Sequence, residues 1–106
     1  DHYALPFIAL GARGVISVVG NFAPRLMRTY TDACLAGRLD EARRLHAQVC
    51  ALQKVAFCET NPIPAKAAVA ALGFCREEYR LPIVPMQPAN RAKLLAVMKA
   101  QGILGG

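Results

Sequence analysis

The sequence predicts a mostly helical protein with one β-strand. Apolar side chains recur at three-then-four spacing between residues 40 and 56, which is the pattern of one face of an amphipathic helix. A short β-branched run, Val15 to Val19, is apolar on both faces and is typical of a buried parallel strand. Proline and glycine residues divide the remainder into further short helices and loops.

The amino-terminal third predicts a helix, a strand and a second helix. Residues 3–10 form the first helix, which ends at Gly11 because glycine accepts the left-handed backbone of a helix terminus. The strand covers Val15 to Val19 and is followed by a helix that begins near Pro24, a residue favoured at the first helical position. Gly37 ends this helix.

The remainder predicts three helices and one irregular segment. Asp40 is expected to cap the long helix that carries the apolar stripe. Two prolines then interrupt the chain, and a short alanine-rich helix follows over residues 65–72. Residues 74–87 are an extended connection, and a last helix runs from Pro88 to about Gly102. Three helices with such apolar faces can bury one another as a small bundle.

Composition excludes several classes of protein. Hydrophobic residues make up 55% of the chain, so intrinsic disorder is excluded, yet every charge-free stretch is too short to span a bilayer. The net charge of +6 is spread over predicted helix faces without interleaved aromatic residues, which indicates solvated surfaces rather than a nucleic-acid site. The amino-terminal residues lack the cationic start and apolar run of a secretory signal.

The cysteines and histidines give no pattern of a metal site. The four cysteines lie far apart, with no Cys-x-x-Cys pair, and are interpreted as reduced, mostly buried thiols of a cytoplasmic protein. His2 and His46 are interpreted as single histidines without a second metal ligand. No glycine-rich dinucleotide fingerprint is present, so we expect neither a metal nor an organic cofactor.

Three short runs carry a resemblance to a known family. They are Gly14 to Asn21 (GVISVVGN), Glu59 to Lys66 (ETNPIPAK) and Arg80 to Pro85 (RLPIVP). Together they resemble the carboxyl-terminal portion of the dihydrodipicolinate synthase family, within the pyruvate-dependent class I aldolase superfamily. The resemblance implies a C-terminal fragment of a (β/α)8 TIM barrel, a fold of about 250 residues, plus a C-terminal helical extension. Residues 1–37 would be the last βα elements, and residues 38–106 the C-terminal helical domain.

The resemblance also implies a function. Members of the family condense pyruvate with aspartate semialdehyde through a lysine Schiff base, in the lysine (diaminopimelate) pathway, and they form homo-oligomers, for which Leu10 is a candidate contact. The family's imine-forming lysine lies on the sixth barrel strand, which the resemblance places outside these residues. We expect no catalytic residue in this chain and an inactive isolated fragment. All four lysines are predicted on helix surfaces: Lys54, Lys66, Lys93 and Lys99.

Three residues match positions that line the family's substrate pocket. Asp1 matches the second acidic residue of a Ser-Gly-Asp-Asp turn, the main-chain carbonyl of Ile16 matches one that faces the imine, and Asn61 matches the pocket rim. Each has a purely structural alternative. Asp1 and Asn61 are also suited to capping a helix, or Asp1 to a frayed terminus, and Ile16 to strand core.

A second function, from a different class, is consistent with the same sequence. The chain would then be an autonomous helical protein-interaction module, whose basic helix faces and apolar stripe bind another protein. A monomer that melts cooperatively and binds no ANS would favour the module, whereas a molten or oligomeric chain would favour part of a barrel.

Overall fold

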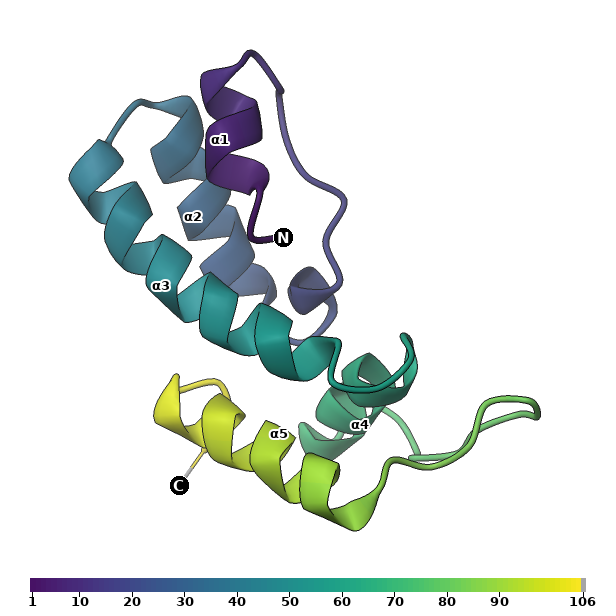
Figure 1. The fold of residues 1–106 in the computed structure, drawn as a ribbon. Coiled ribbons are helices and arrows are strands. Elements are labelled where there is room, and N and C mark those ends of the chain that lie inside the picture. The colour runs from purple at the N-terminus through teal and green to yellow at the C-terminus, as the bar shows by residue number, and fades with distance from the viewer. Residues whose placement is uncertain (106) are drawn as a thin grey trace.

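The computed structural model describes residues 1–105, and residue 106, where the predicted helical domain ends, lies outside the described residues (Figure 1). The described part consists of five α-helices and one 3-10 turn, η1. In chain order these are α1 (Ala4–Ala9), η1 (Val19–Asn21), α2 (Pro24–Leu35), α3 (Leu39–Ala56), α4 (Ile63–Ala71) and α5 (Pro88–Ala100). The mostly helical prediction is therefore confirmed.

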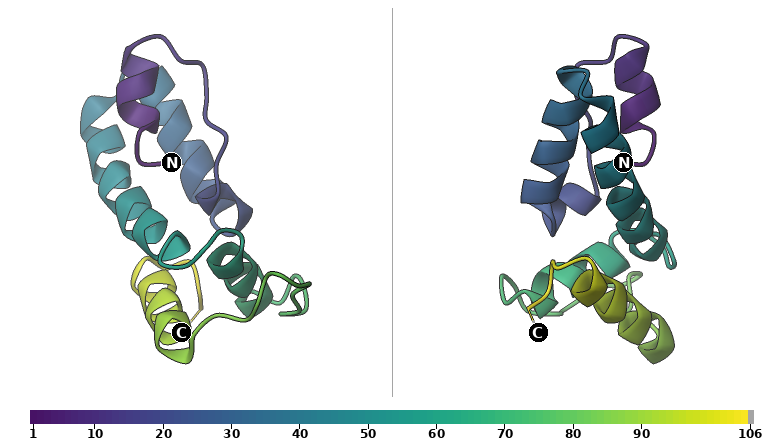
Figure 2. Two further views of the ribbon diagram at one scale, coloured as in Figure 1. Left: turned by 45° about the vertical axis from the view of Figure 1, so that its right-hand side comes forward. Right: turned by 90° about the vertical axis from the view of Figure 1, so that its left-hand side faces the viewer.

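The long helices α2 and α3 run antiparallel and form the centre of the structure (Figure 1). Helix α1 packs against α2, while α4 and α5 pack against each other and against the end of α3 that lies farthest from α1 (Figure 2). The largest fully buried side chains come from η1, α2, α3, α4 and α5 and form the core between them: Tyr30, Leu52, Leu94, Met98, Val19, Val49, Val55 and Pro64.

Local chemistry sets most helix boundaries. Pro24 and Pro88 are the first residues of α2 and α5, where the missing N–H of proline costs no helical hydrogen bond. Gly37 and Gly73 follow α2 and α4 with φ of 72° and 84°, a backbone region that side chains with a Cβ disfavour. The predicted long helix is present, but Asp40 is not its cap. Arg38 precedes the first helical residue, and no side chain caps this end.

The predicted strand from Val15 to Val19 is wrong, because the described residues contain no β-strand. Residues 12–17 are an irregular connection, and Val19 belongs to η1 (Figure 1). A strand is held by hydrogen bonds to a neighbouring strand, and within residues 1–105 there is none to supply them. Accordingly the Ile16 side chain is fully exposed, at 103%, whereas Val19 is 0% exposed.

The predicted boundary at residue 38 falls in the short turn between α2 and α3. These two helices pack against each other along their length, so the predicted segments share one core in this structure. Within the described residues, no helix combines the length and apolarity that a membrane crossing requires.

Candidate functional site

The η1 turn is held in place by the side chain of Asp1. The Asp1 carboxylate accepts a hydrogen bond from the Ser17 hydroxyl through one oxygen. Its other oxygen accepts hydrogen bonds from the backbone N–H groups of Val18 and Val19, each at 3.1 Å. Three donors therefore converge on one carboxylate from residues far away in the sequence, and they fix the shape of the turn.

Gly20 allows this turn to close tightly. Its N–H donates to Ser17 Oγ at 2.7 Å, and a Cβ added at this position would lie 3.1 Å from both the Cβ and the Oγ of Ser17. That spacing is tighter than an ordinary van der Waals contact, so a residue with a Cβ at this position would require Ser17 to shift slightly.

A hollow of about 360 Å³ lies between η1 and the beginning of α4. The side chain of Asn21 borders it and donates to the carbonyls of Ser17 and Val18 at 3.3 and 3.1 Å. Asn61 lies on the α4 side, just before the helix begins. The complete lining combines polar and apolar residues: Val18, Asn21, Asn61, Pro62, Ala65, Lys66, Val69 and Cys75.

Glu59 ties the loop that carries Asn61 to α5. One oxygen of its carboxylate accepts hydrogen bonds from the Gln87 N–H at 2.9 Å and from Asn90 Nδ2 at 2.8 Å. Since Gln87 precedes α5 directly and Asn90 lies in its first turn, the loop and this helix are joined as one unit. The Asn61 side of the hollow is thus positioned by a contact outside the hollow.

An ion pair between Glu77 and Arg91 holds the connection between α4 and α5. The Arg91 guanidinium contacts the Glu77 carboxylate at 2.7 Å, and these hydrogen bonds hold the pKa of Glu77 below its ordinary value. Burial, together with the charge of Glu77, raises the pKa of Tyr79 to about 12. Tyr79 therefore stays protonated, and its hydroxyl lies 3.4 Å from both the Ile63 carbonyl and the Glu77 carboxylate.

The structure separates the three residues predicted to line a pocket. Asn61 borders the hollow, whereas Asp1 does not and instead orders the turn that presents Val18 to it. Ile16 contributes no side chain to the hollow and is fully exposed. Lys66, predicted on the surface, is half-buried at the hollow with its ammonium 5.8 Å from the centre of the Tyr79 ring. The other three lysines are exposed.

Sequence reasoning missed the parts played by Ser17 and Asn21. Both lie in the run GVISVVGN, and the available signal was their residue type together with Gly20, because Ser, Gly and Asn are favoured in turns. Within residues 1–105, no three potential metal ligands among His, Cys, Asp and Glu come together.

Comparison with known proteins gives a consistent result. Residues 1–101 match the model of the dihydrodipicolinate synthetase family. The chain is 48% identical over 104 residues to the 4-hydroxy-tetrahydrodipicolinate synthase of Pelobacter propionicus and covers 36% of that protein. It is 42% identical over 104 residues to the Geotalea uraniireducens enzyme, of which it also covers 36%. In both cases the match includes 98% of this chain.

Solved structures agree with this comparison. The chain resembles part of the dihydrodipicolinate synthase of Aquifex aeolicus with a TM-score of 0.93 and 46% identity, over 97% of this chain and 35% of that one. It resembles the chloride-inhibited Acinetobacter baumannii enzyme, solved with pyruvate, with a TM-score of 0.92 and 35% identity, over 98% of this chain and 36% of that one. The chain therefore spans about a third of these relatives and has the fold of that portion of their barrel.

Proposed function

The chain belongs to the dihydrodipicolinate synthetase family, and on this premise we propose that it lines one side of the substrate pocket of a 4-hydroxy-tetrahydrodipicolinate synthase. Such a lyase condenses pyruvate with aspartate semialdehyde through a lysine Schiff base, in the lysine (diaminopimelate) pathway. The pyruvate complex of the similar Acinetobacter baumannii enzyme supports pyruvate as a substrate. We place the reaction in the cytoplasm, since the four cysteines are free thiols.

One observation carries this proposal. The runs that resemble the family, residues 14–21 and 59–66, are far apart in the sequence but border the same hollow. In the proposed pocket, Asn61 presents its amide to the substrate, and Ile16 contributes its main-chain carbonyl. Asp1 acts as a positioning residue, because its carboxylate is occupied by Ser17, Val18 and Val19.

The imine-forming lysine is proposed to lie outside these 106 residues. An amine that attacks a ketone at neutral pH must be desolvated so that it loses its proton. Lys54, Lys93 and Lys99 are exposed, and Lys66 is only half-buried. None of the four lysines therefore has the enclosed surroundings that this chemistry requires.

Borohydride reduction tests this part of the proposal. The 106-residue chain is incubated with pyruvate and sodium borohydride, and its intact mass is measured, with the complete Aquifex aeolicus enzyme as a positive control. We expect an adduct on the control alone. An adduct on any of the four lysines of this chain would contradict the proposal.

A chimera tests the proposed pocket directly. This chain replaces the matching portion of the Pelobacter propionicus enzyme, to which it is 48% identical, and condensation of the two substrates is measured. We expect an active chimera in which Asn61→Ala lowers kcat/KM roughly tenfold, the effect of one lost hydrogen bond to substrate. Ile16→Ala is the matched control, because it keeps the main-chain carbonyl. An unaffected Asn61→Ala chimera would exclude Asn61 from the pocket.

We also propose that the enzyme is a homo-oligomer. Several large apolar side chains are exposed, including Leu10 at 86%, and Leu10 is the proposed contact between subunits. The same exposed side chains are also consistent with the alternative function, an autonomous helical module that binds another protein. ANS binding and sedimentation separate the two, because a cooperative monomer that binds no ANS would favour the module.

A further inference from the structure

A second cluster of reactive side chains lies between α2 and α3. The Tyr30 hydroxyl of α2 is 2.9 Å from Nδ1 of His46, and Nε2 of the same imidazole is 3.3 Å from Sγ of Cys50. His46 and Cys50 are one helical turn apart on α3, so the same side of the helix presents both. The order thiol, imidazole, orienting hydroxyl is the arrangement that activates a nucleophilic cysteine.

The Tyr30 hydroxyl holds the imidazole ring in position. Tyr30 is 0% exposed, and burial raises its pKa to about 12, so the phenol keeps its proton. Its oxygen accepts the N–H of Leu5 at 3.2 Å, and the same hydroxyl is hydrogen-bonded to Nδ1 of His46. The ring is thereby held with Nε2 against Cys50 Sγ, so one imidazole bridges the phenol and the thiol.

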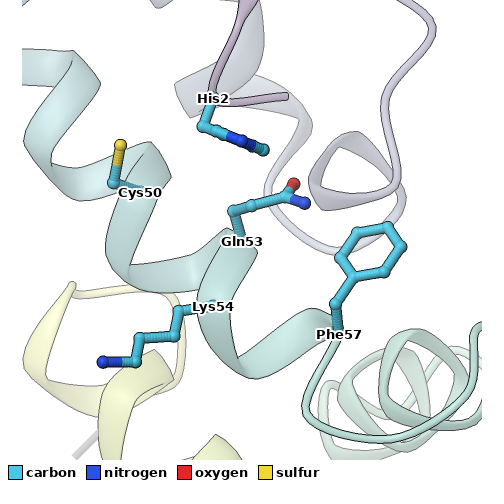
Figure 3. A pocket seen from close by; sticks show the side chains of 5 residues that line it. All are labelled: His2, Cys50, Gln53, Lys54 and Phe57. Atoms are coloured by element: carbon cyan, nitrogen blue, oxygen red, sulfur yellow. The ribbon is translucent and has the colours of Figure 1, made fainter.

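Cys50 also borders a hollow of about 300 Å³, with His2, Gln53, Lys54 and Phe57 (Figure 3). Figure 3 shows the His2 ring beside the amide of Gln53. His2 Nδ1 and Gln53 Oε1 are buried and have no hydrogen-bond partner in the structure. Such atoms are costly to leave unsatisfied, and a polar ligand in this hollow would pair with them.

We propose that Cys50 is a site of thiol–disulfide exchange with low-molecular-weight disulfides. The Cys50 thiol, hydrogen-bonded to His46 Nε2, gives up its proton to solvent, and the thiolate attacks one sulfur of the small disulfide. A bond forms between Cys50 Sγ and that sulfur, the disulfide bond breaks, and the second sulfur leaves as a thiolate that takes a proton from water. Cys50 is thereby oxidised to a mixed disulfide, and the leaving sulfur is reduced.

The other cysteines provide an internal comparison. Cys34 is buried, and burial raises the pKa of its thiol, so it reacts slowly. Cys75 is exposed, and within residues 1–105 no imidazole is hydrogen-bonded to it. If exposure alone decided reactivity, Cys75 would react before the half-buried Cys50. The proposal gives the opposite order.

The test uses glutathione disulfide as the probe. The protein is incubated with it at neutral pH, quenched with acid at intervals and digested, and mass spectrometry gives the rate of modification at each cysteine. We expect Cys50 to react at least about tenfold faster than Cys75, because an imidazole hydrogen-bonded to the thiol promotes its reaction. Equal rates, or a faster reaction at Cys75, would overturn the proposal.

Two variants test the part played by the imidazole. His46→Leu removes the hydrogen-bond partner of Cys50 and is expected to lower the Cys50 rate about tenfold, with the Cys75 rate in the same sample unchanged. Tyr30→Phe keeps the aromatic ring but releases Nδ1, and is expected to lower the Cys50 rate by about twofold. If the ratio of the Cys50 rate to the Cys75 rate in either folded variant equals that of the unchanged protein, the proposal is overturned. Circular dichroism establishes which variants fold.

Discussion

Replacing Asp1 tests whether its carboxylate orders the η1 turn. Asp1→Ala removes the acceptor of the Val18 and Val19 N–H groups, which lie 3.1 Å from the same oxygen. A hydrogen bond to a charged acceptor contributes about 1.5–3 kcal/mol, and the half-buried position of Asp1 favours the lower value. A loss of about 1.5 kcal/mol at each amide corresponds to roughly tenfold faster hydrogen exchange.

Hydrogen exchange followed by NMR measures this effect locally. We expect both valine amides to exchange roughly tenfold faster in Asp1→Ala, and the Gln101 amide at the far end of α5 to be unchanged. Asp1→Asn keeps one acceptor oxygen and is expected to have a smaller effect. If the Val18 and Val19 amides keep their exchange rates in Asp1→Ala, the carboxylate does not hold the turn and Asp1 is free to contact substrate.

Two further predictions concern stability. Leu94→Ala empties a 0% exposed site in the core and is expected to lower the free energy of unfolding by about 3 kcal/mol in urea titrations, against less than about 0.5 kcal/mol for Leu10→Ala. An equal loss in the two variants would contradict the core assignment. Because Arg91 lowers the pKa of Glu77, the stabilisation from this pair is present above the ordinary pKa of the carboxyl and is lost as the pH falls through the lowered value. On acidification, the melting temperature should therefore fall less in Arg91→Met than in the unchanged protein. Identical pH profiles of the melting temperature in the two proteins would refute the pairing.

The helices could be predicted because their boundaries are encoded in a few adjacent residues. Pro24 and Pro88 begin helices for a reason that involves only their own ring, and Gly37 ends one because it alone avoids a Cβ clash at positive φ. The start of α3 was missed by two residues, because the helix begins after Arg38 without a side-chain cap and its first turn holds Asp40.

The segment from Val15 to Val19 could not be predicted by the same means. Its β-branched composition suits a strand, but a strand also needs a neighbour for its backbone hydrogen bonds, and that neighbour is never adjacent in a parallel sheet. In this structure the backbone N–H groups of Val18 and Val19 bond to the Asp1 carboxylate instead. The composition of the segment was informative, whereas its partners could not be deduced from it.

The candidate site shows the same division between local and distant information. The Asn-Pro-Ile-Pro run identified Asn61 because the resemblance depends on a continuous motif. The contact between Asp1 and Ser17 spans 16 residues of sequence. The further contacts of Asp1 are to backbone N–H groups, which nearly any residue provides, so no sequence motif indicates them.

A positioning role for Asp1 and a substrate role for Asn61 are linked through Val18. Asp1 holds the N–H of Val18, and the Val18 side chain borders the hollow opposite Asn61. Loss of the Asp1 carboxylate would therefore alter the hollow without removing any group that contacts substrate. In the chimera, the conservative variant Asp1→Glu should therefore be impaired, because the longer side chain displaces the carboxylate from both N–H groups. If Asp1 instead acted on the substrate directly through its charge, Asp1→Glu would remain active.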